Sequence, residues 1–139
     1  MKFPEPAIFK LISTELGHTR IYPLRAPQNA TAPFVVYQKT GSNDRWRGIN
    51  RPSNIAQASI QIDVYAAAYD DAKTIAAQIE RILDGYRGTV YYGASSPQES
   101  VEIKGISLQN DFDTLDQTDE PFLFRNSADF LVTYGQGTT

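Results

Sequence analysis

Residues 58–66 place the strongest constraint on how this chain folds, because apolar and polar side chains alternate there without a break. A period of two is the period of a β-strand, which turns successive side chains to opposite faces of a sheet. The following segment, residues 71–85, has the longer period of a helix with one apolar stripe, and Asp70 is expected to cap it. Together the two segments predict a sheet with one face buried under a helix. The apolar members are Ala58, Ile60, Ile62 and Val64 in the strand and Ala72, Ile75, Ala76, Ile79, Ile82 and Leu83 in the helix.

The rest of the chain adds a second helix and several shorter strands. Apolar spacing predicts a helix over residues 6–16, which Gly17 ends. The polar segments 41–54 and 111–120 have no periodicity and are expected to be long loops. Segments rich in β-branched and aromatic residues predict further strands, at residues 34–40, 89–92, 101–108 and 122–134.

These elements predict one domain over residues 1–139, of the α+β class. Two helices are too few to cover both faces of such a sheet, so we expect a mainly antiparallel β-sheet with the two helices packed on one face and long inter-strand loops. Gly105 interrupts the alternation of its strand and is expected to mark a bulge. Residues 135–139 are expected to form a flexible C-terminal tail.

The residue types most used in catalysis and in transition-metal binding are nearly absent. The chain has no cysteine and one histidine, His18, which directly follows Gly17 and is expected to cap the first helix or face solvent. The acidic segment 111–120 fails the calcium-loop pattern, because Leu115 and Phe122 stand where oxygen ligands are required. No glycine-rich phosphate loop with its lysine is present. The sequence therefore predicts no catalytic residues, no cofactor and no metal site, and we expect a protein that is not an enzyme.

Charge and hydropathy exclude two further classes of protein. Thirteen basic and 16 acidic side chains give a net charge of −3, which argues against a general nucleic-acid coat. No segment approaches the roughly 20 apolar residues that span a bilayer, and no signal peptide is recognised. We therefore expect a protein that is neither secreted nor embedded in a membrane.

Two polar segments are the candidate sites of interaction. Arg45, Trp46 and Arg47 lie together in the segment 41–54, and tryptophan and arginine are the residues most enriched at the energetic centres of interfaces. A subunit interface is the favoured interpretation; packing of Trp46 on the edge of its own core and stacking on a nucleic-acid base are alternatives. The second segment is acidic and supplies a surface of opposite charge. Its candidate residues are Asp111, Asp113, Asp116, Asp119 and Glu120.

Three segments also stand out as an ordered set. The first is residues 20–38, with Arg20-Ile21-Tyr22-Pro23 and Pro33-Phe34-Val35-Val36-Tyr37-Gln38; the second is residues 60–66 followed by Leu83-Asp84-Gly85; the third is Arg125-Asn126-Ser127-Ala128-Asp129-Phe130. In this order they resemble the tail-completion, or tail-terminator, proteins of long-tailed bacteriophages, prophages and gene-transfer particles. The resemblance extends from about residue 20 to about residue 134.

The resemblance implies a structural virion protein, a subunit of a homo-hexameric ring that terminates the tail tube and then provides the surface for head–tail joining. The implied partners are other copies of the chain, the tail tube protein and the head–tail connector proteins. The genome would pass through the lumen of the ring without sequence-specific contact. The implied location is the tail and neck of the virion, after assembly in the host bacterial cytoplasm.

Two alternatives stay open at this stage. One is a head–tail adaptor or connector of the neck, and the other, of a different class, is a stand-alone ligand-binding regulatory α+β domain. In a closed ring each subunit needs two different, complementary surfaces, and the two segments of opposite charge are candidates for them.

Overall fold

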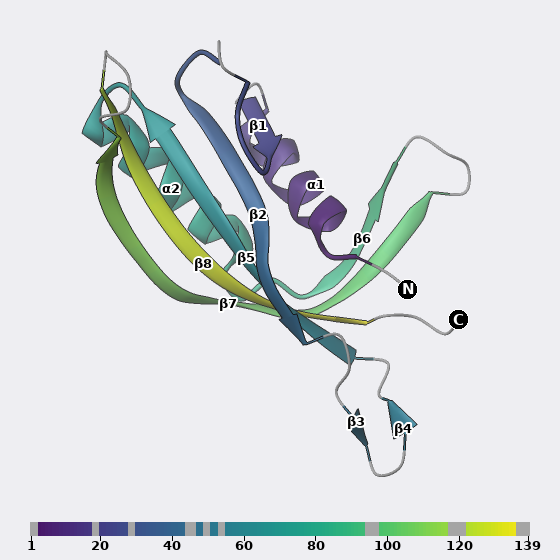
Figure 1. Ribbon diagram of the computed structural model, residues 1–139. Helices are drawn as coiled ribbons and strands as arrows, with labels where there is room; N and C mark the ends of the chain where they lie inside the picture. The colour runs from purple at the N-terminus through teal and green to yellow at the C-terminus, as the bar shows by residue number, and fades with distance from the viewer. Residues whose placement is uncertain are drawn as a thin grey trace.

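The computed structural model describes residues 3–17, 20–27, 30–43, 47–48, 51–52, 55–93, 98–116 and 122–135 (Figure 1). Within this part of the chain, two helices pack on a curled six-stranded sheet, and a two-stranded hairpin projects from the end of β2 and β5. The elements in chain order are α1 Glu5–Leu16, β1 Arg20–Pro23, β2 Phe34–Asn43, β3 Arg47–Gly48, β4 Arg51–Pro52, β5 Ile55–Ala66, α2 Tyr69–Leu83, β6 Gly88–Tyr92, β7 Glu99–Asp116 and β8 Leu123–Gly135.

The large sheet has the strand order β1-β2-β5-β8-β7-β6. Every neighbouring pair is antiparallel except β1 and β2, which run parallel. The α+β class and the mainly antiparallel sheet are therefore confirmed. The strands that pair over the greatest length, β5, β8 and β7, form the middle of the sheet and set its curvature (Figure 1).

The alternation in β5 places this strand at the centre of the fold. Its even-numbered side chains are buried on the concave face of the sheet, with Ile60 fully buried and Ile62 and Val64 nearly so. Phe130 and Val132 of β8 lie directly opposite Ile60 and Ala58 in the register and extend the same apolar layer. The predicted strand and its buried face are confirmed.

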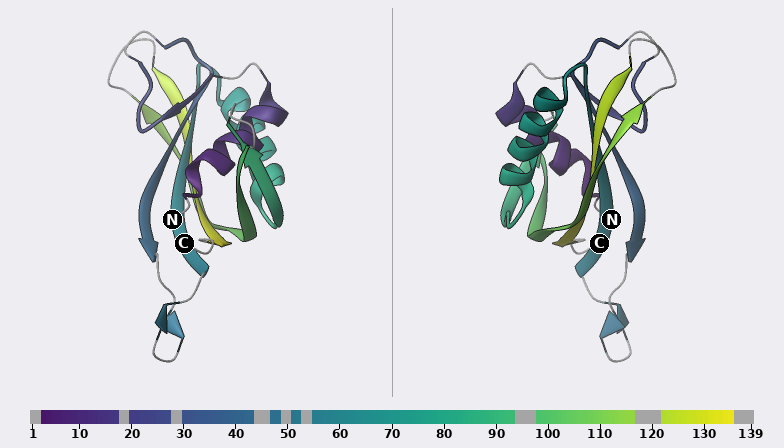
Figure 2. Two further views of the ribbon diagram at one scale, coloured as in Figure 1. Left: turned by 90° about the vertical axis from the view of Figure 1, so that its right-hand side faces the viewer. Right: turned by 90° about the vertical axis from the view of Figure 1, so that its left-hand side faces the viewer.

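Both helices pack on this one apolar face, as predicted, and Figure 2 shows them on the same side of the curled sheet. Gly17 ends α1 with a positive φ of 67°, and its N–H donates to the Ser13 carbonyl, so the expected C-cap is confirmed. The expected cap at Asp70 is wrong, because α2 begins at Tyr69, two residues earlier than predicted, and Ala68 is its N-cap. No helix of the described residues is long and apolar enough to cross a membrane. The buried helix residues are Ala7, Ile8, Ile12 and Leu16 in α1 and Ala72, Ile79 and Leu83 in α2.

The expectation of long loops is corrected in both segments as far as the structure describes them, because residues 41–43, 47–48, 51–52 and 111–116 are strands. The strand β2 continues through Asn43, and β3 pairs with β4 inside the segment 41–54. The strand β7 continues through Asp116 and pairs with β8 along its whole acidic part. A polar segment forms a loop when water satisfies its backbone N–H and C=O groups. Here the neighbouring strands satisfy these groups instead, so the polar segments extend the sheet.

The bulge expected at Gly105 is confirmed by a register shift between Ile103 and Gly105 in the pairing of β7 with β8. A second shift, between Leu108 and Asn110, has no glycine to signal it. Each bulge inserts an extra residue and bends its strand, which allows β7 to follow the curl of the sheet.

Shortening Ile60 should test the predicted burial of one face of β5. Removing this fully buried side chain with Ile60→Ala should cost about 2–5 kcal/mol of unfolding free energy, because a cavity opens in the core. Ser59→Ala is the matched control on the opposite face and should change stability by no more than about 0.5 kcal/mol. Urea denaturation measures both values. Equal losses would mean that β5 is not buried on one face.

Candidate functional site

Asp113 is the centre of a polar cluster that joins α2 to the edge of the sheet. The Asn126 side-chain amide donates a hydrogen bond of 2.7 Å to one carboxylate oxygen, and the Tyr69 hydroxyl donates one of 3.0 Å to the other. The Lys73 ammonium lies 3.3 Å from the same oxygen as Tyr69. Asn126 faces Asp113 directly in the register of β7 and β8, while Tyr69 and Lys73 are one turn apart on α2.

The hydrogen bonds of this cluster favour the charged forms of its acid and its base. The Asn126 amide is the main cause that holds the pKa of the Asp113 carboxyl below its usual value, and Tyr69 and Lys73 act in the same direction. The hydrogen bond to Asp113 raises the pKa of Lys73, and it also raises the pKa of the Tyr69 hydroxyl. The cluster therefore holds a carboxylate and an ammonium at neutral pH and fastens the first turn of α2 to β7.

A second polar cluster lies on the opposite, outer face of the sheet, around Asp63. This carboxylate is only 5% exposed and accepts hydrogen bonds from the Gln61 amide at 3.0 and 3.2 Å. The Arg125 guanidinium lies 3.2 Å from it and 5.8 Å from the centre of the Tyr65 ring. Burial of a charge costs free energy unless it is paired, and here the partners are Gln61 of the same strand and Arg125 of the neighbouring strand β8.

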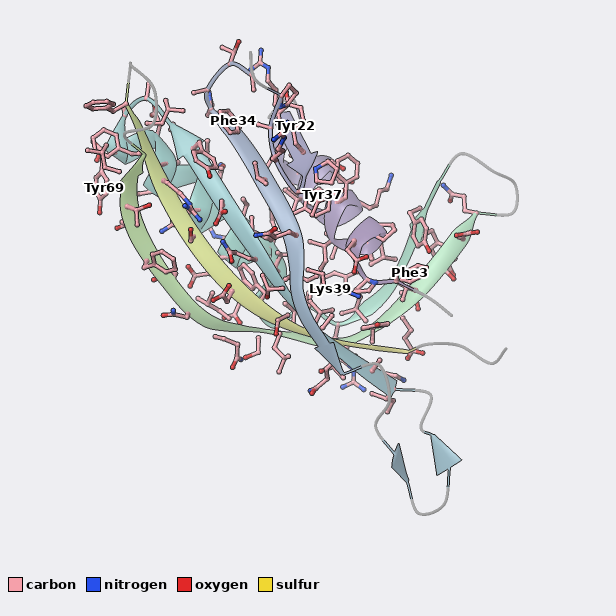
Figure 3. All side chains as sticks on the ribbon, viewed as in Figure 1. Phe3, Tyr22, Phe34, Tyr37, Lys39 and Tyr69 are labelled. Atoms are coloured by element: carbon pink, nitrogen blue, oxygen red, sulfur yellow. The ribbon has the colours of Figure 1, made fainter. Side chains whose placement is uncertain are left out.

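Aromatic rings continue this outer surface toward the edge of the sheet. The Phe34 ring stacks on the Tyr65 ring with their centres 4.8 Å apart, and the Tyr22 ring meets Phe34 edge-on at 6.3 Å (Figure 3). With Arg125, these rings form one row across β1, β2, β5 and β8. The row is a rigid, partly apolar surface whose shape is set by the backbone register.

Two hollows lie beside α1, where the helix fills the space between the two ends of the curled sheet. One, of about 630 Å³, lies between α1, α2 and β6 and is lined by Leu11, Ile82 and Tyr91 among others. The other, of about 550 Å³, is lined by Phe3, Phe9, Tyr37 and Tyr92 and opens near the start of the chain (Figure 3). Both hollows are open to solvent and are lined by polar as well as apolar side chains, so they are surface grooves.

The acidic half of β7 is strongly exposed. All residues from 109 to 115 are exposed, although a strand that covers one core normally buries every second side chain. Phe112 and Leu115 are exposed by 45% and 42%, on opposite faces of the strand. This part of β7 is therefore accessible to solvent on both of its faces.

The candidate interface residues divide into three groups. Asp111 and Asp113 lie on β7 with exposed side chains. Arg47 begins β3 and Asp116 ends β7, and the structure describes the backbone but not the side chain of each. The remaining candidates lie outside the described residues, as does His18; they are Arg45, Trp46, Asp119 and Glu120.

The structure separates the hairpin of β3 and β4 from the acidic half of β7. The hairpin of β3 and β4 extends from the lower end of β2 and β5, while the acidic half of β7 runs to the upper end of the sheet (Figure 1). Among the described residues, no group of three or more histidine, cysteine, aspartate or glutamate side chains is arranged to hold a metal ion.

Sequence reasoning missed the two clusters around Asp113 and Asp63. The sequence held a signal for each. Asn126 is the one polar residue among the alternate, otherwise apolar positions of its strand, and Asp63 is one of the alternate polar positions of β5. Apart from Gln61, which lies on the same strand as Asp63, their partners come from other strands and from α2, and the fold alone shows which residues they are.

The described elements define the class of protein as a small α+β fold, with two helices on one face of a curled, mainly antiparallel sheet. The profile of the family described as tail completion protein gp17 matches residues 6–118. The chain belongs to this family, and it is a structural protein of a phage-type tail.

A chain of known structure in the "Virion of native gene transfer agent (GTA) particle" has a similar fold, with a TM-score of 0.60 and 13% sequence identity. The similarity covers 93% of this chain and 92% of the other. No curated protein matches the sequence. Since the identity is low, this likeness establishes the fold and leaves the residue roles to be argued from this chain.

Acid should weaken the Asp113 cluster selectively. Folding lowers the pKa of this carboxyl below the value of about 3.9 for an unfolded chain, so its stabilisation is fully present above that value and is lost as the pH falls through the folded pKa. The melting temperature of Asp113→Asn should therefore fall less than that of the wild type between about pH 5 and about pH 2. Asp111→Asn, which removes an equal charge outside the cluster's hydrogen bonds, should follow the wild type. Identical profiles for the wild type and Asp113→Asn would contradict this assignment.

Removing Arg125 should leave the buried Asp63 carboxylate short of a partner. We expect Arg125→Met to cost about 2 kcal/mol, less than the roughly 3–5 kcal/mol of a fully buried pair, because the Arg125 side chain is 31% exposed. The double variant Asp63→Asn/Arg125→Met should recover part of this loss, since no unpaired charge remains. Urea denaturation of both variants measures the coupling free energy between Asp63 and Arg125. A double variant that is less stable than Arg125→Met would contradict the pairing of these two charges.

Proposed function

We propose that this protein forms a closed homo-hexameric ring that terminates the tail tube and then provides the surface for head–tail joining. The observation that carries the proposal is the separation of a basic hairpin and an acidic strand at different ends of one subunit, in a chain of a tail completion family. Because the two surfaces lie apart within one subunit, they are free to meet in neighbouring subunits.

Ring closure requires an interface of this kind. A ring is held by heterologous contacts, in which one surface of each subunit binds a different surface of the next. Arg45, Trp46 and Arg47 supply a basic surface with one large aromatic anchor. The acidic surface is supplied by Asp111, Asp113, Asp116, Asp119 and Glu120.

The proposed partners follow from this role. Besides further copies of itself, the ring would bind the tail tube protein on one side and the head–tail connector proteins on the other, and the genome would pass through its lumen. Its place would be the tail and neck of the virion, after assembly in the host bacterial cytoplasm. Its work would be structural and not enzymatic.

A head–tail adaptor is the alternative within the same class, since an adaptor also forms contacts in the neck. Membership of a tail completion family favours the terminator, and it argues against a stand-alone regulatory domain. Electron microscopy of particles that lack the protein distinguishes the two neck roles. We expect overlong tails; tails of normal length detached from capsids would favour the adaptor.

Charge reversal in the basic segment should weaken ring assembly. We expect Arg45→Glu/Arg47→Glu to shift the protein from rings toward monomers, because the two new carboxylates would face the acidic surface of the neighbouring subunit. Arg25→Glu is the matched control, since Arg25 is exposed in the turn after β1 and lies outside both candidate surfaces. Light scattering gives the mass of each assembly. Wild-type ring mass and normal tails in the double variant would refute the role of these arginines.

A further inference from the structure

The backbone groups along the outer edge of β7 have hydrogen-bond partners in the first part of the strand, and in the second part the described residues supply none. The strand β6 pairs with residues 99–103. The turn after α2 covers the next part, where the Gly85 N–H donates to the Ile106 carbonyl at 2.8 Å and the Leu108 N–H donates to the Asp84 carboxylate at 3.0 Å. Of the described residues, none pairs with the outer edge of residues 109–116.

The strand β2, on the other side of the sheet, also has an outer edge that is only partly paired by the described residues. The short strand β1 pairs with residues 34–37, and the Leu24 N–H donates to the Tyr37 carbonyl at 2.9 Å. From residue 38 to residue 43 the described part of the chain offers no partner on this side, and Lys39, Thr40 and Gly41 are exposed.

We propose that the ring is built by pairing these two edges, with residues 109–116 of β7 in one subunit bound to residues 38–43 of β2 in the next. The occupant of each edge is thus a second copy of this chain, and the contact is an antiparallel extension of the sheet. This inference rests on the ring proposed above and names the backbone that joins its subunits.

The topology supports the direction of the pairing. The strands β2, β5, β8 and β7 are antiparallel in succession, so β7 runs opposite to β2 within one subunit. Rotation about a ring axis preserves the direction of any strand that runs along that axis. With both strands along the ring axis, β7 of one subunit would therefore meet β2 of the next in antiparallel orientation, and the alternation of the sheet would continue across the interface.

Charge complementarity supports the choice of partner. Asp111 pairs with Ala128 and Asp113 with Asn126, on the concave face of the sheet, and Lys39 pairs with Ile60 on that same face of its own subunit. In antiparallel pairing of these two ranges Lys39 lies opposite residues 113–115, so the extended sheet would bring its ammonium beside the Asp113 carboxylate, which also binds Lys73 in its own subunit. Like charges on adjacent strands repel, so the acidic edge disfavours pairing with another acidic edge and favours the basic one.

The absence of cysteine from the chain permits a direct test by disulfide cross-linking. Lys39→Cys is combined in the full-length protein with Asp111→Cys or with Leu115→Cys, each on the concave-face parity of β7, and the ring is oxidised. We expect a ladder of covalent oligomers on a non-reducing gel that collapses to one band on reduction. Asp113 is left intact because it fastens α2.

The matched control is Lys39→Cys combined with Gln78→Cys, since Gln78 is exposed on α2 away from both edges. We expect this pair to give no ladder. Light scattering on the reduced variants separates the two proposals. Intact rings without a ladder from either edge pair would overturn the edge pairing and leave the ring standing, whereas a monomer for the unmodified protein at every concentration would overturn both. Cross-links formed only with a different tail protein would also overturn the pairing.

Discussion

The structure depends on the pairing of β5 with β8, which runs without interruption from Ile55 opposite Gly135 to Ala66 opposite Phe124. This register decides which face of the sheet meets the helices. A slip of one residue would turn Ile60 and Ile62 to the outer face and bring Asp63 into the apolar core, so the hydrophobic effect fixes the register strongly. The positions of β2 and β7, on either side of this pair, follow from it.

The two polar clusters lie on opposite faces of the sheet, and both depend on the register of β5 with β8. Asp63 and Arg125 meet on the outer face because the register sets Tyr65 opposite Arg125 and Asp63 opposite Ser127. Asp113 meets the Asn126 amide on the concave face, where α2 brings Tyr69 and Lys73 to the same carboxylate. Each cluster joins elements that are distant in sequence.

A structural protein of a tail must remain soluble as a single chain and yet bind its neighbours in a defined order. Open strand edges are a liability for a free subunit, and proteins protect them with charge. In the edge pairing proposed above, the carboxylates on β7 would have this role, since they would oppose pairing between identical edges and remain compatible with an edge that carries Lys39. The bulge after Leu108 bends β7 beyond the turn that covers Ile106, and this bend separates the covered part of the edge from the open part.

The sequence by itself determined the period of each main element. It gave correct predictions for both helices, the central strand, the bulge at Gly105 and the α+β class, because these follow from local spacing of apolar side chains and from glycine. It also singled out the charged segments, and the resemblance of its ordered segments to tail-completion proteins is confirmed by the family match. The tertiary structure decided that residues 111–116 of the acidic segment are strand and that Asp113 is a cluster centre. Those outcomes depend on which strand lies alongside, since backbone hydrogen bonds and side-chain partners across a sheet come from residues far away in the chain, and local composition carries no record of them.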